Sequence, residues 1–182
     1  MHIETTSIDG LFTLTPRVFE DARGYFFESY NESVFTEKGI SYRWVQDNQS
    51  SSSRGVIRGL HFQAPPFAQA KLIRVLQGVI LDVAVDIRKG SPTYGKHIAI
   101  ELSADNKKQF LIPPGFAHGF SVLSERAEVL YKCDGFYNKS AEGGLYFGDP
   151  ALGIDWMISE AETIISEKDQ VLPLLTDLTS PF

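Results

Sequence analysis

The sequence contains 182 residues, a length that suits one domain and is short for two. Hydrophobic residues make up 43% and charged residues 22% of the chain, a composition typical of a folded globular protein and not of a disordered one. Its 17 basic and 23 acidic residues give a net charge of −6, which argues against a general nucleic-acid binder.

Targeting and cross-linking features point to an intracellular protein. No apolar run exceeds three residues, so we expect no transmembrane helix. The N-terminus has neither a basic nor an apolar signal region, so we expect no secretory signal. Cys133 is the only cysteine and can form neither an internal disulfide nor a zinc cluster. We therefore predict a single cytoplasmic domain over residues 1–182.

The predicted elements are mostly strands. Asn31 is a suitable N-cap and Gly39 a suitable C′ residue, which predicts a helix between them. In residues 79–88 the odd positions are apolar and the even ones include Asp82, Asp86 and Arg88, which predicts a strand with one buried and one polar face. Further short runs lie at 98–102, 109–112, 119–123 and 128–133, and a second short helix is expected near 160–165. Strands at this spacing predict an antiparallel sandwich or barrel.

Residues 54–63 are dense in groups that can carry chemistry, with two arginines, two glycines and a histidine. One interpretation is a turn followed by an exposed polar edge. The other is a cavity lining in which Arg58 binds an anion. Arg58 and His61 have opposite parity, so a regular strand would point them to opposite faces. Only an irregularity at Gly59 would bring both into one cavity.

Other candidates are single residues on strand-like segments. Lys71 shares a face with Ile73 and Val75, an unusual place for a lysine unless it has a counter-charge or a function. His118 and Tyr131 also fall on apolar faces, where a hydrogen-bonded core residue is the alternative interpretation. By themselves, Lys168 and Asp169 look like solvated surface residues.

Common catalytic templates are absent from the chain. The sequence has no dinucleotide-binding or phosphate-binding glycine motif and no nucleophile elbow. The four histidines show no metal-ligand spacing, and a site built from His61 and His118 alone would lack a third protein ligand. We expect no metal and no cofactor.

Beyond these local patterns, the chain resembles the dTDP-4-dehydrorhamnose 3,5-epimerase family over nearly its whole length. The matching blocks occur in one order, which makes the resemblance far more specific than any single motif. They are PRVF (16–19), RG (23–24), QDN (46–48), RGLHFQ (58–63), QAKL (69–72), DVAVDIR (82–88), SPTYG (91–95), PPGFAHGF (113–120), YKC (131–133) and SEKD (166–169).

This resemblance implies an all-β fold, a cupin-like double-stranded antiparallel jelly roll with a few short helices. The segment 113–118 is similar to the second cupin motif. In metal-binding cupins the first motif has a His-x-His pair and a later glutamate, but here His61 is followed by Phe62 and Gln63, and Lys71 stands in the glutamate's place. A cation at that position should repel a metal and attract an oxyanion, so the resemblance implies metal-free chemistry.

In the family, C3 and C5 of a dTDP-linked 4-keto-6-deoxy sugar are inverted through an enolate. The resemblance assigns His61 as the base, oriented by Asp169, and Tyr131 as the acid on the other face of the sugar. It places Lys71 beside the keto oxygen. Residues matching positions that contact substrate are Arg23, Glu28, Gln46, Asn48, Arg58, Lys71, His118, Tyr137, Glu142 and Lys168, with Arg23 and Arg58 on the diphosphate and Tyr137 stacked on the thymine.

The family also implies a homodimer. N-terminal segments reach the partner, so Arg23 or Glu28 is expected to serve the neighbouring site, and residues 150–182 are expected to pack on the barrel. Two alternatives remain open from the sequence. One is a mono-epimerase or ketoisomerase acting on another dTDP-4-keto-6-deoxy sugar. The other is a non-catalytic nucleotide-sugar binding module.

Overall fold

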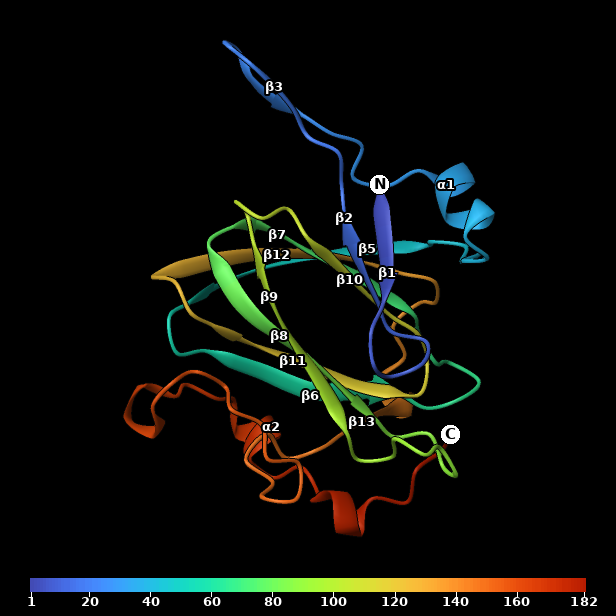
Figure 1. Cartoon of the computed structure of the whole chain (residues 1–182). Coiled ribbons are helices and arrows are strands. Elements are labelled where there is room, and N and C mark those ends of the chain that lie inside the picture. Colours follow the sequence, from blue (N-terminus) through green and yellow to red (C-terminus); the bar gives the residue numbers. More distant parts are fainter.

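Two antiparallel sheets face each other in a computed structural model that describes all residues from Met1 to Phe182 (Figure 1). The six-stranded sheet contains, in spatial order, β1 (His2–Thr5), β2 (Phe12–Thr15), β10 (Gln109–Ile112), β7 (Lys71–Gln77), β12 (Arg126–Cys133) and β5 (Gln46–Ser53). The five-stranded sheet contains β13 (Glu142–Gly144), β6 (Ile57–Gln63), β11 (Phe116–Val122), β8 (Val79–Asp86) and β9 (His97–Ser103). The all-β jelly-roll prediction is confirmed.

Three apolar clusters hold these layers together. The largest lies between the sheets and includes Ile73 and Phe110 from one sheet and Ile80 from the other. A second covers the outer face of the five-stranded sheet, where Trp156 of the C-terminal segment packs. A third covers the outer face of the six-stranded sheet around Phe35. Both faces of each sheet are therefore partly covered, which buries more apolar surface than a simple sandwich would.

The prediction for residues 79–88 needs a correction. The segment forms β8, but its even face is not polar surface, because Ile80, Asp82, Ala84 and Asp86 are all 0% exposed. These residues point between the sheets, while Leu81, Val83 and Val85 on the odd face pack under the C-terminal segment. Alternation signalled the two faces correctly, but each buried aspartate has polar partners that a single-strand pattern cannot reveal.

Helices are few and short. The predicted helix after Asn31 is confirmed as α1 (Glu32–Glu37), because the Asn31 side chain accepts from the Ser33 and Val34 amides and Gly39 takes a positive φ after its end. The expected helix near 160–165 is only the 3₁₀ turn η2 (Glu160–Glu162). The other elements are α2 (Glu167–Gln170), η1 (Lys139–Ala141) and η3 (Leu175–Asp177). None of these helices has the length and the apolar sequence that a membrane span requires.

The C-terminal segment lies against the outer face of the five-stranded sheet (Figure 1). Backbone hydrogen bonds tie it down at intervals, including Ile57 N to Ile164 O at 3.0 Å and Lys89 N to Phe182 O at 2.8 Å. This anchoring brings α2 against β6, and α2 carries Asp169.

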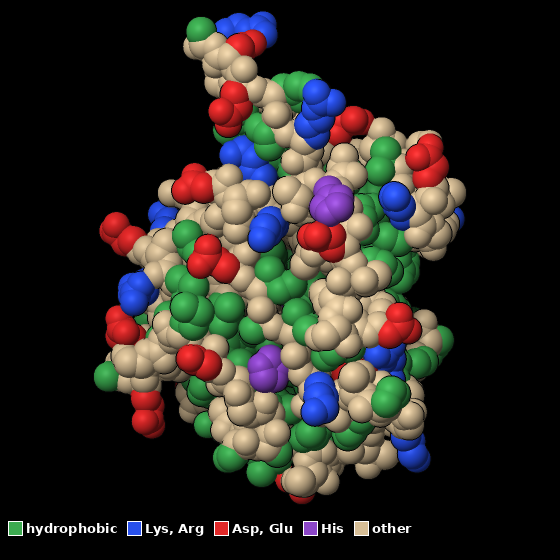
Figure 2. All heavy atoms as spheres, viewed as in Figure 1, with side chains coloured by type: hydrophobic (Ala, Val, Ile, Leu, Met, Phe, Trp, Pro, Cys, Tyr) green, Lys and Arg blue, Asp and Glu red, His purple; other side chains and the backbone are tan.

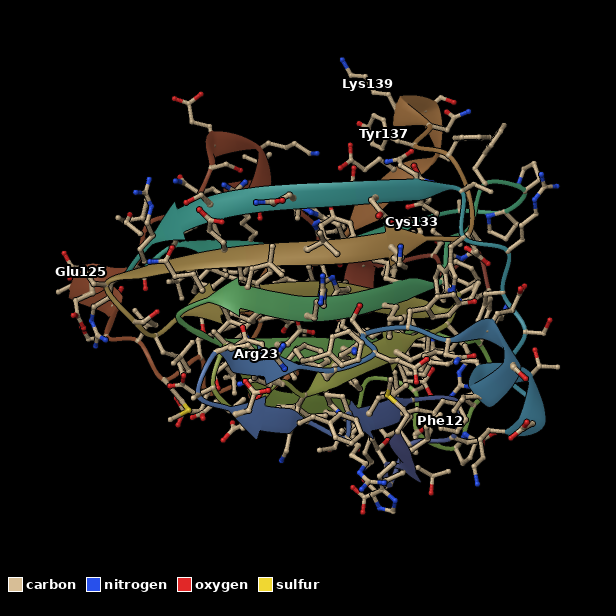
Figure 3. All side chains as sticks on the ribbon, turned by 90° about the horizontal axis from the view of Figure 1, so that it is seen from above. Phe12, Arg23, Glu125, Cys133, Tyr137 and Lys139 are labelled. Carbon is tan, nitrogen blue, oxygen red and sulfur yellow. The ribbon has the colours of Figure 1, made fainter.

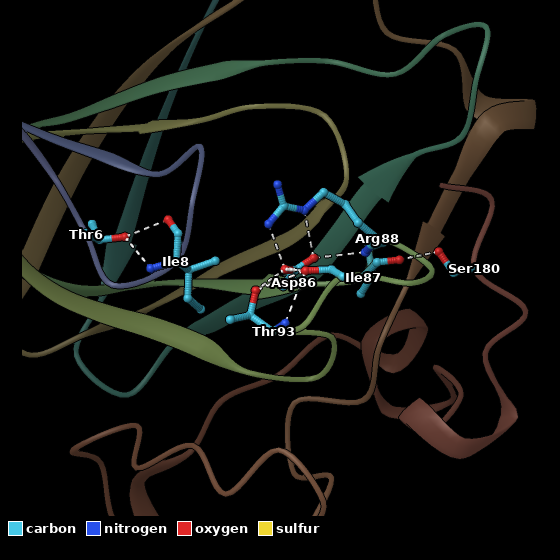
Figure 4. A network of polar contacts seen from close by, with 8 residues as sticks. Thr6, Ile8, Asp86, Ile87, Arg88, Thr93 and Ser180 are labelled. Atoms are coloured by element: carbon cyan, nitrogen blue, oxygen red, sulfur yellow. Dashed lines mark hydrogen bonds and ion pairs between the residues drawn. The ribbon is translucent and has the colours of Figure 1, made fainter.

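A buried carboxylate secures the end of β8 (Figure 4). Asp86 accepts from Arg88 Nε and Nη2 at 2.9 and 2.7 Å, from Ser91 Oγ at 2.7 Å and from Thr93 Oγ1 at 2.6 Å. Burial acts to raise the pKa of Asp86, but these donors outweigh it and lower the pKa to about 2. Next to it, Ser180 Oγ donates to the Ile87 carbonyl, which links the network to the C-terminal segment.

One element leaves the body of the molecule. The hairpin of β3 (Phe19–Asp21) and β4 (Gly24–Phe26) projects away from the two large sheets (Figures 1 and 2). Three of its aromatic side chains, Phe19, Tyr25 and Phe26, are 52%, 61% and 66% exposed. Elsewhere on the face in Figure 2, acidic and basic side chains are interspersed.

Candidate active site

A cavity of about 550 Å³ opens between the two sheets, and a smaller lobe of about 180 Å³ adjoins it. Both lobes share His61, Lys71 and Tyr131 in their linings, so they form one continuous site. The larger lobe also contains Arg58, His118, Lys168 and Asp169, and the smaller one contains Gln46, Asn48, Tyr137 and Glu142. All but two of the predicted site residues therefore line one cavity.

A bulge in β6 brings Arg58 and His61 to the same side. His61 pairs with His118 of β11, and Arg58 pairs with Phe120. Between these two pairs β6 therefore contains one more residue than β11, which is a β-bulge. Gly59 lies in this bulge and has a φ of +120°, a conformation that allows the extra residue. A Cβ there would lie 2.5 Å from Gly119 Cα and 2.6 Å from the His118 carbonyl oxygen. The irregularity expected at Gly59 is confirmed, and the exposed-edge interpretation of residues 54–63 is wrong.

His61 meets a carboxylate that is distant in sequence. Its Nε2 lies 2.7 Å from Asp169 Oδ1, and Asp169 is only 4% exposed. Because an ionised carboxylate only accepts hydrogen bonds, Nε2 carries the proton and Nδ1 keeps its lone pair. Burial lowers the pKa of His61, and Asp169 partly offsets this. The result is a neutral, oriented imidazole, the state that a general base needs.

Asp169 is not the surface residue that its local sequence suggested. It belongs to α2, where the Ser166 hydroxyl caps the Asp169 amide at 3.2 Å. The helix is only four residues long, too short for any periodic pattern to reveal its buried face.

Lys71 provides a cation in the middle of the site. It stands opposite Cys133 in the pairing of β7 with β12. Burial lowers the pKa of Lys71, and the carboxylates of Asp82 and Glu142 oppose this effect. Burial also raises the pKa of the Cys133 thiol to about 11, so Cys133 stays neutral beside the lysine. An ammonium so placed can stabilise negative charge on a bound oxygen.

Tyr131 faces His61 from the opposite sheet. It lies on the inward face of β12 with Ala127, Val129 and Cys133, as predicted, but its side chain also lines the cavity. Burial and the neighbouring Cys133 raise the pKa of Tyr131, while Arg58 and Asn48, its cross-strand neighbour, act to lower it. The phenol is therefore protonated near neutral pH and can donate a proton.

A second histidine–carboxylate pair lies deeper between β11 and β8. His118 Nε2 is 2.9 Å from Asp82 Oδ1, and the two residues are 8% and 0% exposed. His118 is thus both a satisfied buried histidine and part of the cavity wall. Each of these two histidines is paired with one carboxylate, and no group of three or more His, Cys, Asp or Glu side chains is placed to hold a metal ion.

The smaller lobe is organised around Glu142. Tyr137 donates its hydroxyl proton to Glu142 Oε2 at 3.0 Å, and Lys168 Nζ lies 2.5 Å from Glu142 Oε1. Burial acts to raise the pKa of Glu142, but Lys168 and Tyr137 outweigh it and lower the pKa. Glu142 therefore joins an exposed aromatic ring to the helix that carries Asp169.

Arg23 and Glu28 lie outside this cavity. Arg23, labelled in Figure 3, is on the projecting hairpin. Its side chain is 90% exposed and paired with Asp21. Glu28 accepts from Asn31 Nδ2 at 2.7 Å, beside α1. The structure of one chain thus does not bring these two predicted residues to the other eleven.

Several lining residues were missed from the sequence. Ser50, Phe120, Ile164, Ile165, Ser166, Gln63 and Gln69 contribute to the walls but were not predicted. Ser50 could have been found, because Gln46, Asn48 and Ser50 alternate along β5 and share its inward face. Its hydroxyl is buried without a hydrogen-bond partner.

Known proteins resemble this chain over nearly its whole length. Residues 5–177 match a family model described as dTDP-4-dehydrorhamnose 3,5-epimerase. A dTDP-4-dehydrorhamnose 3,5-epimerase of Pseudomonas aeruginosa is 51% identical over 90% of each chain. The crystal structure of such an enzyme from Elizabethkingia anophelis is 54% identical, with a TM-score of 0.93 over 97% of each chain. A Legionella pneumophila epimerase in complex with dTDP-4-keto-L-rhamnose is 46% identical, with a TM-score of 0.93 over 97% of this chain and 94% of that one.

Proposed function

This chain belongs to the dTDP-4-dehydrorhamnose 3,5-epimerase family, and we propose on this premise that it is an isomerase that inverts C3 and C5 of dTDP-4-dehydro-6-deoxy-D-glucose. The product is dTDP-4-dehydro-L-rhamnose, so the enzyme serves dTDP-L-rhamnose biosynthesis. The observation that carries this proposal is the convergence of the His61–Asp169 pair, Lys71 and Tyr131 on one cavity.

The chemistry begins with a carbon acid. A proton next to the C4 ketone is removed, and the electron pair delocalises onto O4 as an enolate. We assign proton removal to His61 Nδ1, since Asp169 occupies Nε2 and supports the imidazolium that forms. A positioned base of this kind contributes roughly 10²–10⁴-fold in rate.

Lys71 then stabilises the enolate oxygen. One preorganised partner for a developing oxyanion is worth on the order of 3–4 kcal/mol. The buried position of Lys71 favours this role because its charge is poorly screened by water there.

Tyr131 completes the inversion. His61 comes from the five-stranded sheet and Tyr131 from the six-stranded one, so a sugar bound between the sheets has one on each side. The phenol donates its proton to the face opposite His61, which leaves an imidazolium and a phenolate. Both return to their starting states by exchanging protons with solvent, and the same cycle at the second carbon inverts the other centre.

The rest of the cavity suits the nucleotide. Arg58, held by Ser52 Oγ at 3.0 Å, is placed to bind the diphosphate, and the exposed ring of Tyr137 is placed to stack on the thymine. We also expect the enzyme in the cytoplasm, where reducing conditions suit its unpaired Cys133.

We further propose a homodimer in which the hairpin of β3 and β4 reaches the partner's cavity. Its exposed aromatic side chains and the distance of Arg23 from its own cavity support this assembly. Arg23 or Glu28 would then complete the diphosphate site of the neighbouring subunit.

Solvent exchange tests the reaction. With the 4-keto substrate in D₂O, we expect deuterium at both C3 and C5, and none with His61→Ala. Label at one carbon only would indicate a mono-epimerase, and no label with the wild-type protein would indicate a binding module or another substrate.

A further inference from the structure

The loop that carries Tyr137 is held by glutamine side chains. Four consecutive residues, 135–138, each form one backbone hydrogen bond to a glutamine. Gln69 Nε2 donates to Gly135 O at 2.6 Å, and Gln63 Nε2 donates to Phe136 O at 3.3 Å. The Tyr137 amide donates to Gln46 Oε1 at 3.1 Å, and the Asn138 amide donates to Gln63 Oε1 at 2.6 Å.

Gln63 is central to this arrangement. It is 7% exposed and lies on β6 two residues after His61, on the same face. Besides its two bonds to residues 136 and 138, its amide donates to Phe67 O at 2.7 Å. One side chain thus joins the loop at 64–70 to the loop at 134–138. Its amide nitrogen and its carbonyl oxygen both form hydrogen bonds with backbone groups, so it has little capacity left to bind substrate.

Tyr137 depends on this loop for its position. Its ring is 56% exposed, so packing alone fixes it poorly, and its hydroxyl is held only by Glu142. In Figure 3 Tyr137 lies near the Cys133 end of β12, to one side of the strand and away from the Glu125 end. The ring's orientation is therefore set by the backbone that the glutamines hold.

We propose that Gln63 is a positioning residue that preorganises Tyr137 as the platform for the nucleotide base. The inference rests on the proposed function, because it takes the thymine to stack on Tyr137. If the loop is already ordered, binding of the base does not have to supply the free energy of ordering it, so the affinity for the base is higher. The Gln63 side chain hydrogen-bonds the backbone of residues 67, 136 and 138 and none of the side chains assigned to proton transfer, so it acts on binding and not on proton transfer.

The test compares two ligands that share a diphosphate. Wild-type protein, Gln63→Met and a control, Gln49→Met, are titrated with dTDP and with inorganic pyrophosphate. Gln49 is an exposed glutamine on β5 that bonds Glu128 and not this loop. We expect Gln63→Met to raise the Kd for dTDP about tenfold, the effect of losing a well-placed stacking partner. Its Kd for pyrophosphate should stay within twofold, and Gln49→Met should change neither.

Steady-state kinetics supply the second readout. Gln63→Met should raise KM for the nucleotide sugar while kcat, and deuterium labelling of both carbons at saturation, remain close to wild type. An unchanged dTDP affinity, or an equal loss for both ligands, would overturn the inference. If Gln63→Met does not fold, Gln69→Met, which removes the hydrogen bond to Gly135 of the Tyr137 loop, decides by the same criteria. Failure of wild-type protein to bind dTDP would overturn the proposed function itself.

Discussion

Replacing Asp169 with asparagine tests the contact on which the base depends. Asp169 is 4% exposed and 2.7 Å from His61 Nε2, so the substitution removes a buried, charge-assisted hydrogen bond. An asparagine amide can donate to Nε2, which would move the imidazole proton to Nδ1 and block the base nitrogen. The substitution also leaves the imidazolium intermediate without its carboxylate.

We expect kcat to fall by about 10³-fold, within the range for loss of a functional base. Burial already lowers the pKa of His61 and Asp169 partly offsets this, so without the carboxylate the pKa falls further. The acid limb of kcat/KM should therefore move to lower pH, because the residual base stays neutral in more acidic solution. The charged groups near His61 are Asp169, Lys168, Lys71 and Glu142, and only the first is altered.

The assay is the pH dependence of product formation and of deuterium exchange. Serine at position 166 offers a matched control, because Ser166→Ala removes a cap on the same helix while leaving the carboxylate in place. Activity of Asp169→Asn within tenfold of wild type, or an acid limb that moves to higher pH, would refute this account of the base.

Four further predictions concern other parts of the molecule. Burial lowers the pKa of Lys71, so kcat/KM should fall in alkali with an apparent pKa below 10.5. Lys71→Arg should shift this alkaline limb of the pH profile to higher pH, and an unshifted limb would argue against an ammonium on the enolate. Gly59→Ala should lower the free energy of unfolding in denaturant by about 3 kcal/mol, because a Cβ at φ +120° meets β11. An unfolding midpoint equal to that of the wild type would show that the bulge tolerates a side chain. The folded-state pKa of Asp86, about 2, lies below its ordinary value of 3.8. The ionised carboxylate therefore stabilises the folded state by about 2 kcal/mol, an effect that is complete above pH 3.8 and lost as pH falls through about 2. Asp86→Asn should show little of this acid dependence in thermal melts. Mixing inactive Arg23→Ala and His61→Ala subunits should restore about a quarter of wild-type activity if Arg23 serves the partner, and none if it serves its own cavity.

The periodic elements were the most predictable part of the chain. Helix α1 followed from its caps at Asn31 and Gly39, and the inward face of β12 followed from alternation. Strand β8 was found, but its polar face was not recognised as buried, because the partners of its aspartates, His118 and Arg88, lie outside β8. Burial of both faces is a property of the layers and not of any one strand.

Long-range contacts within the site could not be derived from local patterns. Asp169 and His61 are separated by 108 residues, and only the family resemblance brought them together. The Arg58 and His61 parity conflict was visible in the sequence, and so was its resolution at Gly59. The role of Gln63 was not visible, because it depends on two loops that meet only in the folded chain.

Stereochemistry of solvent labelling in Tyr131→Phe tests the central claim most directly. The account requires proton removal on one face of the sugar and delivery on the other. Tyr131→Phe should therefore return substrate that carries deuterium with its configuration retained, since His61 can still remove and replace a proton on its own face. Deuterated product inverted at both carbons at the wild-type rate would contradict delivery by Tyr131.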